Sequence, residues 1–137
     1  MTVRPGTVAD VPRMVELAGR FYDASGLPMP FERAAVEAQM LACVTEPGRC
    51  GLVSEGGLIC GALAPLLSAP SWIMAVEIVW WAEDGSGLAL LRAFEAWARE
   101  VGANEVRMTT LHRMPRTGRA MERLGYRPEE ISYSRML

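Results

Sequence analysis

The longest uncharged part of the chain runs from Gly56 to Val76, and it limits the fold more than any other feature. Its length approaches that of a membrane-spanning helix. Pro65 interrupts it, and so does the turn-forming cluster at residues 68–71, which holds a second proline. Prolines and a turn cluster fit two short buried strands better than one continuous helix. We therefore expect a sheet-containing protein without a membrane segment.

The basic residues exclude several chemistries. The chain has 137 residues, a length typical of one domain, and all 14 basic residues are arginine. Without lysine it cannot form a lysine-containing P-loop, a pyridoxal Schiff base or a lysine nucleophile. The single histidine, His112, excludes a His-rich metal centre or an HExxH protease, and we expect no metal.

The cysteines indicate a reducing compartment. Cys43, Cys50 and Cys60 are odd in number and lack CxxC spacing, which argues against a disulfide framework and a zinc site. The first ten residues lack the basic and then apolar profile of a signal peptide. We expect a cytoplasmic protein.

Apolar periodicity and turn signals predict an α/β order of elements. Residues 7–10 have the form of a capping box before a helix, residues 55–57 are typical of a hairpin turn, and Gly102 follows a helix as a C-cap glycine. The expected strands cover residues 2–4, 49–54, 58–67, 72–81, 105–110 and 126–136, and the expected helices cover residues 11–22, 31–44, 90–101 and 115–124. This order predicts one domain over residues 1–137, with a mixed sheet flanked by helices.

The junction before the helix at residues 90–101 is rich in glycine. Gly85 and Gly87 let the backbone approach a ligand closely, and a helix N-terminus offers unpaired N–H groups and the positive end of a dipole. This combination suits a pyrophosphate and needs no lysine. A plain tight turn is the alternative interpretation.

The chain resembles the GNAT N-acetyltransferases, which transfer acetyl from acetyl-CoA to an amine. Asp84-Gly-Ser-Gly87-Leu-Ala89 fits that family's Gln/Arg-x-x-Gly-x-Gly/Ala motif except at its first position. Glu122-Arg-Leu-Gly125-Tyr126 is similar to the family's C-terminal Lys-x-Gly-Phe signature. The resemblance covers nearly the whole chain and implies a GNAT domain at residues 1–137, with a mixed, mostly antiparallel sheet.

The resemblance also implies a binding site for acetyl-CoA as cosubstrate. A strand amide would stabilise the oxyanion of the tetrahedral intermediate. Residues 107–137 carry 7 arginines and 3 acids, whereas residues 1–106 carry 7 arginines and 13 acids, so positive charge gathers where the phosphates would lie. The implied ligands are the backbone of Gly85, Ser86, Gly87, Leu88 and Ala89 for the pyrophosphate, the backbone of Val79, Trp80 and Trp81 for the pantetheine arm, and Arg113, Arg116, Arg119 and Arg123 for the phosphates.

Two positions depart from the family pattern. Asp84 stands where the family has Gln or Arg, and Glu83 precedes it, so two carboxylates would repel a pyrophosphate unless they point away or arginines offset them. Met121 stands where the family often has a tyrosine acid, and methionine cannot donate a proton. Ser132, Tyr133 or water would then protonate the leaving thiolate.

Glu77 is the expected catalytic base. It is the lone acid in an apolar strand, and burial would raise its pKa. A structural acid paired with an arginine, or one at the solvent edge, is the alternative. His112 is a second titrating candidate, expected in a loop.

The acceptor is an amine of a small molecule or protein, and the sequence does not identify it. The family's acceptor wall corresponds to a largely apolar segment that could equally form a homodimer surface; its residues are Phe21, Tyr22, Asp23, Leu27, Met29, Phe31 and Glu32. A degenerate protein that binds CoA or a protein partner without turnover is the alternative function. We expect neither nucleic acid nor membrane as a partner, because no nucleic-acid-binding motif accompanies the arginines.

Overall fold

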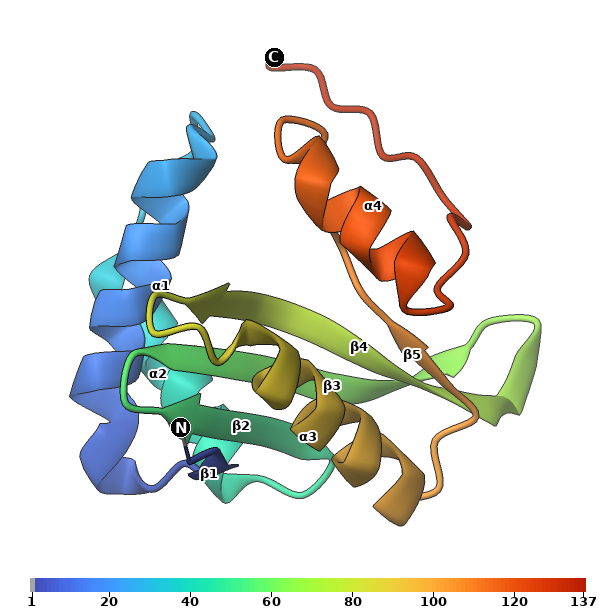
Figure 1. Cartoon of the computed structure of the whole chain (residues 1–137), viewed down its shortest axis with the longest axis horizontal. Coiled ribbons are helices and arrows are strands. Elements are labelled where there is room, and N and C mark those ends of the chain that lie inside the picture. The colour runs from blue at the N-terminus through green and yellow to red at the C-terminus, as the bar shows by residue number, and fades with distance from the viewer. Residues whose placement is uncertain (1) are drawn as a thin grey trace.

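The computed structural model describes residues 2–137 and contains one five-stranded sheet in the order β1-β2-β3-β4-β5 (Figure 1). Strands β4 and β5 are parallel and every other neighbouring pair is antiparallel. The expected mixed, mostly antiparallel sheet is confirmed. Its strands are β1 (Arg4–Pro5), β2 (Arg49–Ser54), β3 (Gly57–Leu66), β4 (Ala69–Ala82) and β5 (Glu105–Arg107). The helices are η1 (Val8–Asp10), α1 (Val11–Ser25), α2 (Arg33–Thr45), α3 (Gly87–Glu100) and α4 (Pro115–Arg123).

The uncharged stretch forms two strands, as predicted. It covers β3 and the first half of β4, which pair along most of their length. Leu58, Ile59 and Cys60 are fully buried, which explains why this part of the chain carries no charge. In the described part of the chain, no helix is long and apolar enough to cross a membrane.

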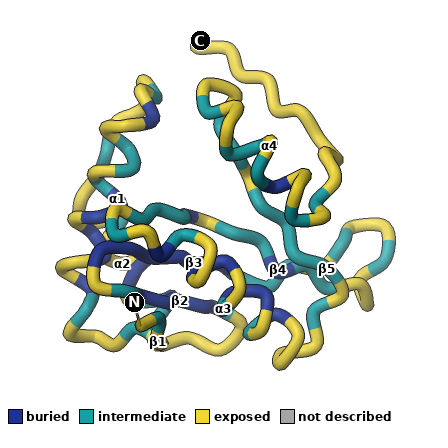
Figure 2. The backbone as a smooth tube through the Cα atoms, in the orientation of Figure 1, coloured by how far each residue is buried: buried dark blue, intermediate teal, exposed yellow. Residues whose placement is uncertain are grey.

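Helices cover both faces of the sheet and form two apolar clusters. Helices α1 and α2 pack on one face, where Met14 and Leu17 meet Leu58 and Cys60. Helix α3 packs on the other face through Leu90 and Phe94. Figure 2 shows the buried residues concentrated in β2, β3 and the helix faces against them.

Local signals explain where several elements begin and end. The expected capping box is present, with Asp10 accepting hydrogen bonds from Thr7, and it starts η1 directly ahead of α1. The hairpin turn closes where Ser54 pairs with Gly57. Helix α3 ends before Gly102, whose φ of 81° is the left-handed conformation expected of a C-cap glycine.

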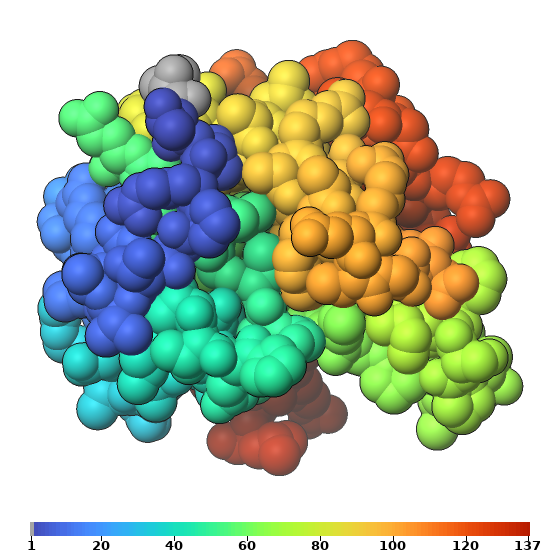
Figure 3. Space-filling model, turned by 90° about the horizontal axis from the view of Figure 1, so that it is seen from below, coloured from blue at the N-terminus to red at the C-terminus, as the bar shows by residue number. Residues whose placement is uncertain are grey.

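The sequence prediction is wrong at the C-terminal end. Residues 126–136 form no strand, and β5 ends at Arg107 instead of Thr110. The amide of Tyr126 donates to the carbonyl of Met121 and its hydroxyl to Glu95, so the chain turns back on α4 and α3. We call residues 127–137 the C-terminal arm. It runs beside α4 in Figure 1, and its dark red end projects beyond the rest of the molecule in Figure 3.

Candidate active site

The site lies where β4 and β5 separate. Their parallel pairing ends at Val76 and Arg107, after which the chain from β5 leaves the sheet toward α4 (Figure 1). Beyond this point β4 continues to Ala82 with β3 on one side only. The outer edge of β4 therefore offers backbone N–H and C=O groups that no strand of the described chain occupies.

A β-bulge lies at the start of this open edge. Gly61 pairs with Glu77 and Cys60 with Val79, so Ile78 is the extra residue. Its apolar side chain is 45% exposed. Bulges bend a strand and redirect its groups, and they are frequent next to active sites.

Glu77 sits at the fork between the two strands. Its Oε2 accepts a hydrogen bond of 3.3 Å from the amide of Thr109, and within residues 2–137 no arginine forms an ion pair with it. Burial raises the pKa of Glu77 to about 7, and the Thr109 bond opposes this only in part. A carboxyl with this pKa can accept a proton near neutral pH.

The two acids that depart from the family motif are held by other groups. The Asp84 carboxylate accepts hydrogen bonds from Ser54 Oγ at 2.9 Å, from the Gly56 amide at 2.8 Å, and from both the amide and the hydroxyl of Ser86. These donors, Ser86 foremost, hold the pKa of Asp84 well below its usual value. Asp84 thus ties the β2–β3 hairpin to the start of α3.

Glu83 is similarly engaged. It pairs with Arg20 of α1 and accepts a hydrogen bond of 3.1 Å from Trp81 Nε1. Both bonds lower the pKa of Glu83. Arg20 therefore offsets the charge of Glu83, so this carboxylate repels a nearby pyrophosphate less than a free one would.

The first turn of α3 offers free donors. Gly87, Leu88 and Ala89 occupy the first helical positions, whose N–H groups have no acceptor within a helix. Gly85 has a φ of 79°, so the chain can reverse sharply just ahead of the helix. A Cβ on Gly87 would lie 3.8 Å from Trp80 and Ala82, which is ordinary van der Waals contact, so a small side chain fits here but a large one would press on Trp80.

A groove of about 340 Å³ runs between α3 and α4. Trp80 lines it and donates a 3.0 Å hydrogen bond from Nε1 to the Gly87 carbonyl. Met121 is 5% exposed and lies in the groove wall, so the position at which the family often carries a tyrosine holds an apolar side chain here. The complete lining is Trp80, Leu88, Ala120, Met121, Arg123 and Leu124.

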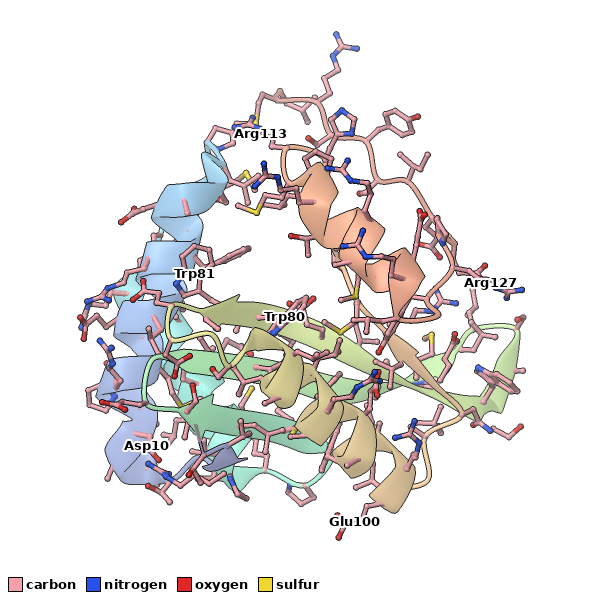
Figure 4. All side chains as sticks on the ribbon, in the orientation of Figure 1. Asp10, Trp80, Trp81, Glu100, Arg113 and Arg127 are labelled. Atoms are coloured by element: carbon pink, nitrogen blue, oxygen red, sulfur yellow. The ribbon has the colours of Figure 1, made fainter. Side chains whose placement is uncertain are left out.

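The predicted arginines divide into two kinds. Arg113 donates a 2.8 Å hydrogen bond to the Gly26 carbonyl, which joins the loop before α4 to the end of α1 (Figure 4). Arg123 lines the groove. Arg116 and Arg119 are exposed on the same helix, and none of these three α4 arginines forms an ion pair within residues 2–137.

The expected acceptor wall contacts the open strand. Phe21 packs edge-on against Trp81, with ring centroids 5.9 Å apart, and Tyr22 packs against Phe31. Figure 4 shows Trp81 at the end of β4 nearest α1 and Trp80 nearer α3. His112 lies exposed in the loop before α4, and Ser132 and Tyr133 lie on the exposed C-terminal arm.

Several residues of the site carry no local sequence signal. The Thr109 amide, the bulge at Ile78 and the Arg113–Gly26 contact all depend on partners far along the chain. Of the features of the site, the glycine turn and the lone acid in an apolar strand can be predicted from the sequence.

Comparison with known proteins identifies the fold. No protein-family model matches the chain, and no curated protein matches it either. Among solved structures, the tetramutant of the BH1408 protein from Bacillus halodurans is 16% identical with a TM-score of 0.81, covering 100% of both chains. A putative acetyltransferase from Agrobacterium tumefaciens is 18% identical with a TM-score of 0.75, also covering 100% of both.

A third solved structure contains acetyl-CoA. A predicted acetyltransferase from Clostridium acetobutylicum, solved with acetyl-CoA, is 12% identical with a TM-score of 0.77 and covers 98% of this chain and 95% of its own. At such identities the likeness shows the fold. The separated parallel strands, the helix after the glycine turn and these neighbours together confirm the predicted architecture: the chain has the fold of the GNAT acetyltransferases.

Proposed function

We propose that this protein is an acetyl-CoA-dependent N-acetyltransferase that works by direct attack of an amine on the thioester. The observation that carries the proposal is the fork between β4 and β5. It combines an unoccupied strand edge, a carboxyl with a pKa of about 7 and, at the end of the same strand, a helix with free first-turn amides. The acetyltransferase fold of the neighbouring structures supports the same reaction class.

Each part of acetyl-CoA has a suitable partner in this arrangement. The amides of Gly87, Leu88 and Ala89 suit the pyrophosphate, because they lie at the positive end of the helix dipole and have no acceptor within the helix, whereas the Ser86 amide already donates to Asp84. The open edge of β4 at Val79–Trp81 suits the amide groups of pantetheine, which can pair as a strand would. Arg123 and its neighbours on α4 supply charge for the phosphates.

The chemistry requires one base and one oxyanion donor. Glu77, acting directly or through water, takes a proton from the ammonium, and the neutral nitrogen then attacks the thioester carbonyl carbon. A free amide of β4 stabilises the oxyanion of the tetrahedral intermediate. The C–S bond breaks as the carbonyl re-forms, the nitrogen gives up its second proton to water, and the CoA thiolate takes a proton from water, because Met121 has none to give.

A CoA-binding protein without turnover is the second candidate function. The observation in its favour is Met121, which lines the groove and cannot protonate a thiolate. Binding of acetyl-CoA with no thiol release from a broad amine panel would establish it.

Two measurements test the proposal. Acetyl-CoA binding is measured by calorimetry, and thiol release is then followed with small and peptidic amines. Gly87→Trp puts a bulky side chain at the first turn of α3, beside Trp80, and should abolish binding while the thermal transition of the protein remains. The control variant is Gly19→Ala on α1, where a Cβ fits. Gly48 is not suitable for this purpose, because its φ of 74° would strain any residue with a Cβ. Retained affinity in Gly87→Trp would place the phosphates elsewhere.

A further inference from the structure

The C-terminal arm pairs with no strand of the described chain. It belongs to no helix or strand, and every residue from Arg127 to Leu137 is exposed, as the yellow tube in Figure 2 shows. Ile131 and Tyr133 are 77% and 88% exposed. Large apolar side chains at alternate positions favour a β-strand, and a β-strand needs a second strand to pair with.

The arm is complementary to itself when two copies run antiparallel. With Ser132 opposite Ser132, Ile131 faces Tyr133 of the second copy, and Glu129 faces its Arg135. All four residues are odd-numbered, so they lie on one side of the segment. A two-fold axis through Ser132 makes each of these contacts twice. Opposite charges and apolar pairs directly across from each other are the contacts that stabilise antiparallel strands.

The charges on the arm are available for this pairing. Arg135 forms no ion pair with any residue that the structure describes. Glu129 pairs only with Arg127 at 2.9 Å, and such solvent-exposed pairs are weak and exchange readily.

A second contact orients the arm. Glu130 pairs with Arg107 of β5 at 3.0 Å, so in this structure an even-numbered residue points toward the arm's own subunit. Because successive side chains of an extended segment point to opposite sides, the odd-numbered residues then face outward. In Figure 1 the arm lies on the side of α4 away from α1.

We propose that the C-terminal arm pairs with the same arm of a second copy of this chain, antiparallel about Ser132, and so forms a two-fold symmetric dimer. The interface is one strand from each subunit, which is small, and we expect dissociation constants of about 1–100 µM. The dimer does not depend on the proposed acetyl transfer.

Charge reversal tests the register. Glu129→Arg and Arg135→Glu should each weaken the dimer by at least about tenfold in sedimentation velocity, and the double variant should restore it because the pair is re-formed with opposite polarity. Glu55→Arg and Arg33→Glu make the same charge changes at exposed positions in the β2–β3 turn and at the start of α2, and they should leave the dimer intact. Equal effects of the arm and control variants would overturn the proposal, as would a wild-type monomer throughout this concentration range.

A cysteine cross-link tests the symmetry axis. The three natural cysteines are buried, so Ser132→Cys adds the accessible thiol. Opposite residues of antiparallel strands have Cα atoms about 4.5–5.5 Å apart, which a disulfide can bridge. Mild oxidation should give a covalent dimer for Ser132→Cys and not for the control Glu55→Cys. A dimer that forms without this cross-link would show that another surface joins the subunits.

Discussion

At the residue scale, Glu77 links burial to pH dependence. Its pKa of about 7 lies above the ordinary value of 4.5, so the folded protein binds this proton more tightly than the unfolded chain. Stability should therefore fall as pH rises from about 4.5 to about 7, and Glu77→Gln should flatten that slope in denaturant titrations. If Glu77 is the base of the proposed reaction, it works in its ionised form, so turnover should rise with pH through about 7 and the variant should lose this limb.

The matched control for this prediction is Glu55→Gln, at an exposed turn position. It should keep both the stability slope and the pH–rate limb. A Glu77→Gln enzyme with an unchanged rate at saturating amine would remove Glu77 from the base role. An unchanged stability slope would instead show that its proton is not held by burial.

Asp84 is the residue at which the site departs most from the family motif, and it has a structural function here. Four donors from Ser54, Gly56 and Ser86 converge on its carboxylate. Asp84→Asn keeps the shape but turns an NH₂ group toward these donors, and we expect a loss of about 2 kcal/mol in the free energy of unfolding. Because the folded-state pKa of Asp84 is lowered, the wild type should lose this advantage as pH falls below about 4.

Denaturant midpoints at neutral and acidic pH measure this effect. Asp23→Asn, at an exposed position of α1, should change neither midpoint appreciably. An Asp84→Asn protein as stable as the wild type at neutral pH would mean that the four hydrogen bonds add nothing net.

At the scale of the elements, the contact between β3 and α3 depends on Gly61. A Cβ there would lie 2.5 Å from the Phe94 ring and 2.7 Å from the Val76 carbonyl, so helix and strand would have to separate. We expect Gly61→Ala to lower the free energy of unfolding by about 3 kcal/mol. Gly19→Ala on α1 meets only the Phe31 ring at 3.7 Å and should raise it by about 0.5–1 kcal/mol. Thermal unfolding of the two variants shifting in the same direction would contradict this packing.

The elements also show which parts of the fold can be predicted from the sequence. Order, hairpin turn and caps were predictable because each has a local signal, such as Gly102 after α3 or the capping box at Thr7. The length of β5 and the free C-terminal arm were not, because alternating apolar residues specify a strand but not whether an edge is there to receive it. The site divides in the same way. Glu77 and the glycine turn are visible in the sequence, whereas the ligands of Asp84 and the Thr109 bond exist only once distant segments meet.

At the scale of the whole molecule, the net charge is −2, but the charge is unevenly distributed and is positive around α4. If phosphates bind there, acetyl-CoA affinity should fall as salt rises, because ions screen charges over about 10 Å at 0.1 M. Arg123 lines the groove, so Arg123→Gln should weaken binding by about tenfold and reduce the salt dependence. Arg33→Gln changes the net charge equally at an exposed position on α2 and should stay within about twofold of the wild type. Calorimetry at low and high salt distinguishes a direct contact of Arg123 from a general electrostatic attraction. Equal weakening by both variants would mean that the overall field of the protein attracts acetyl-CoA and that Arg123 makes no contact of its own.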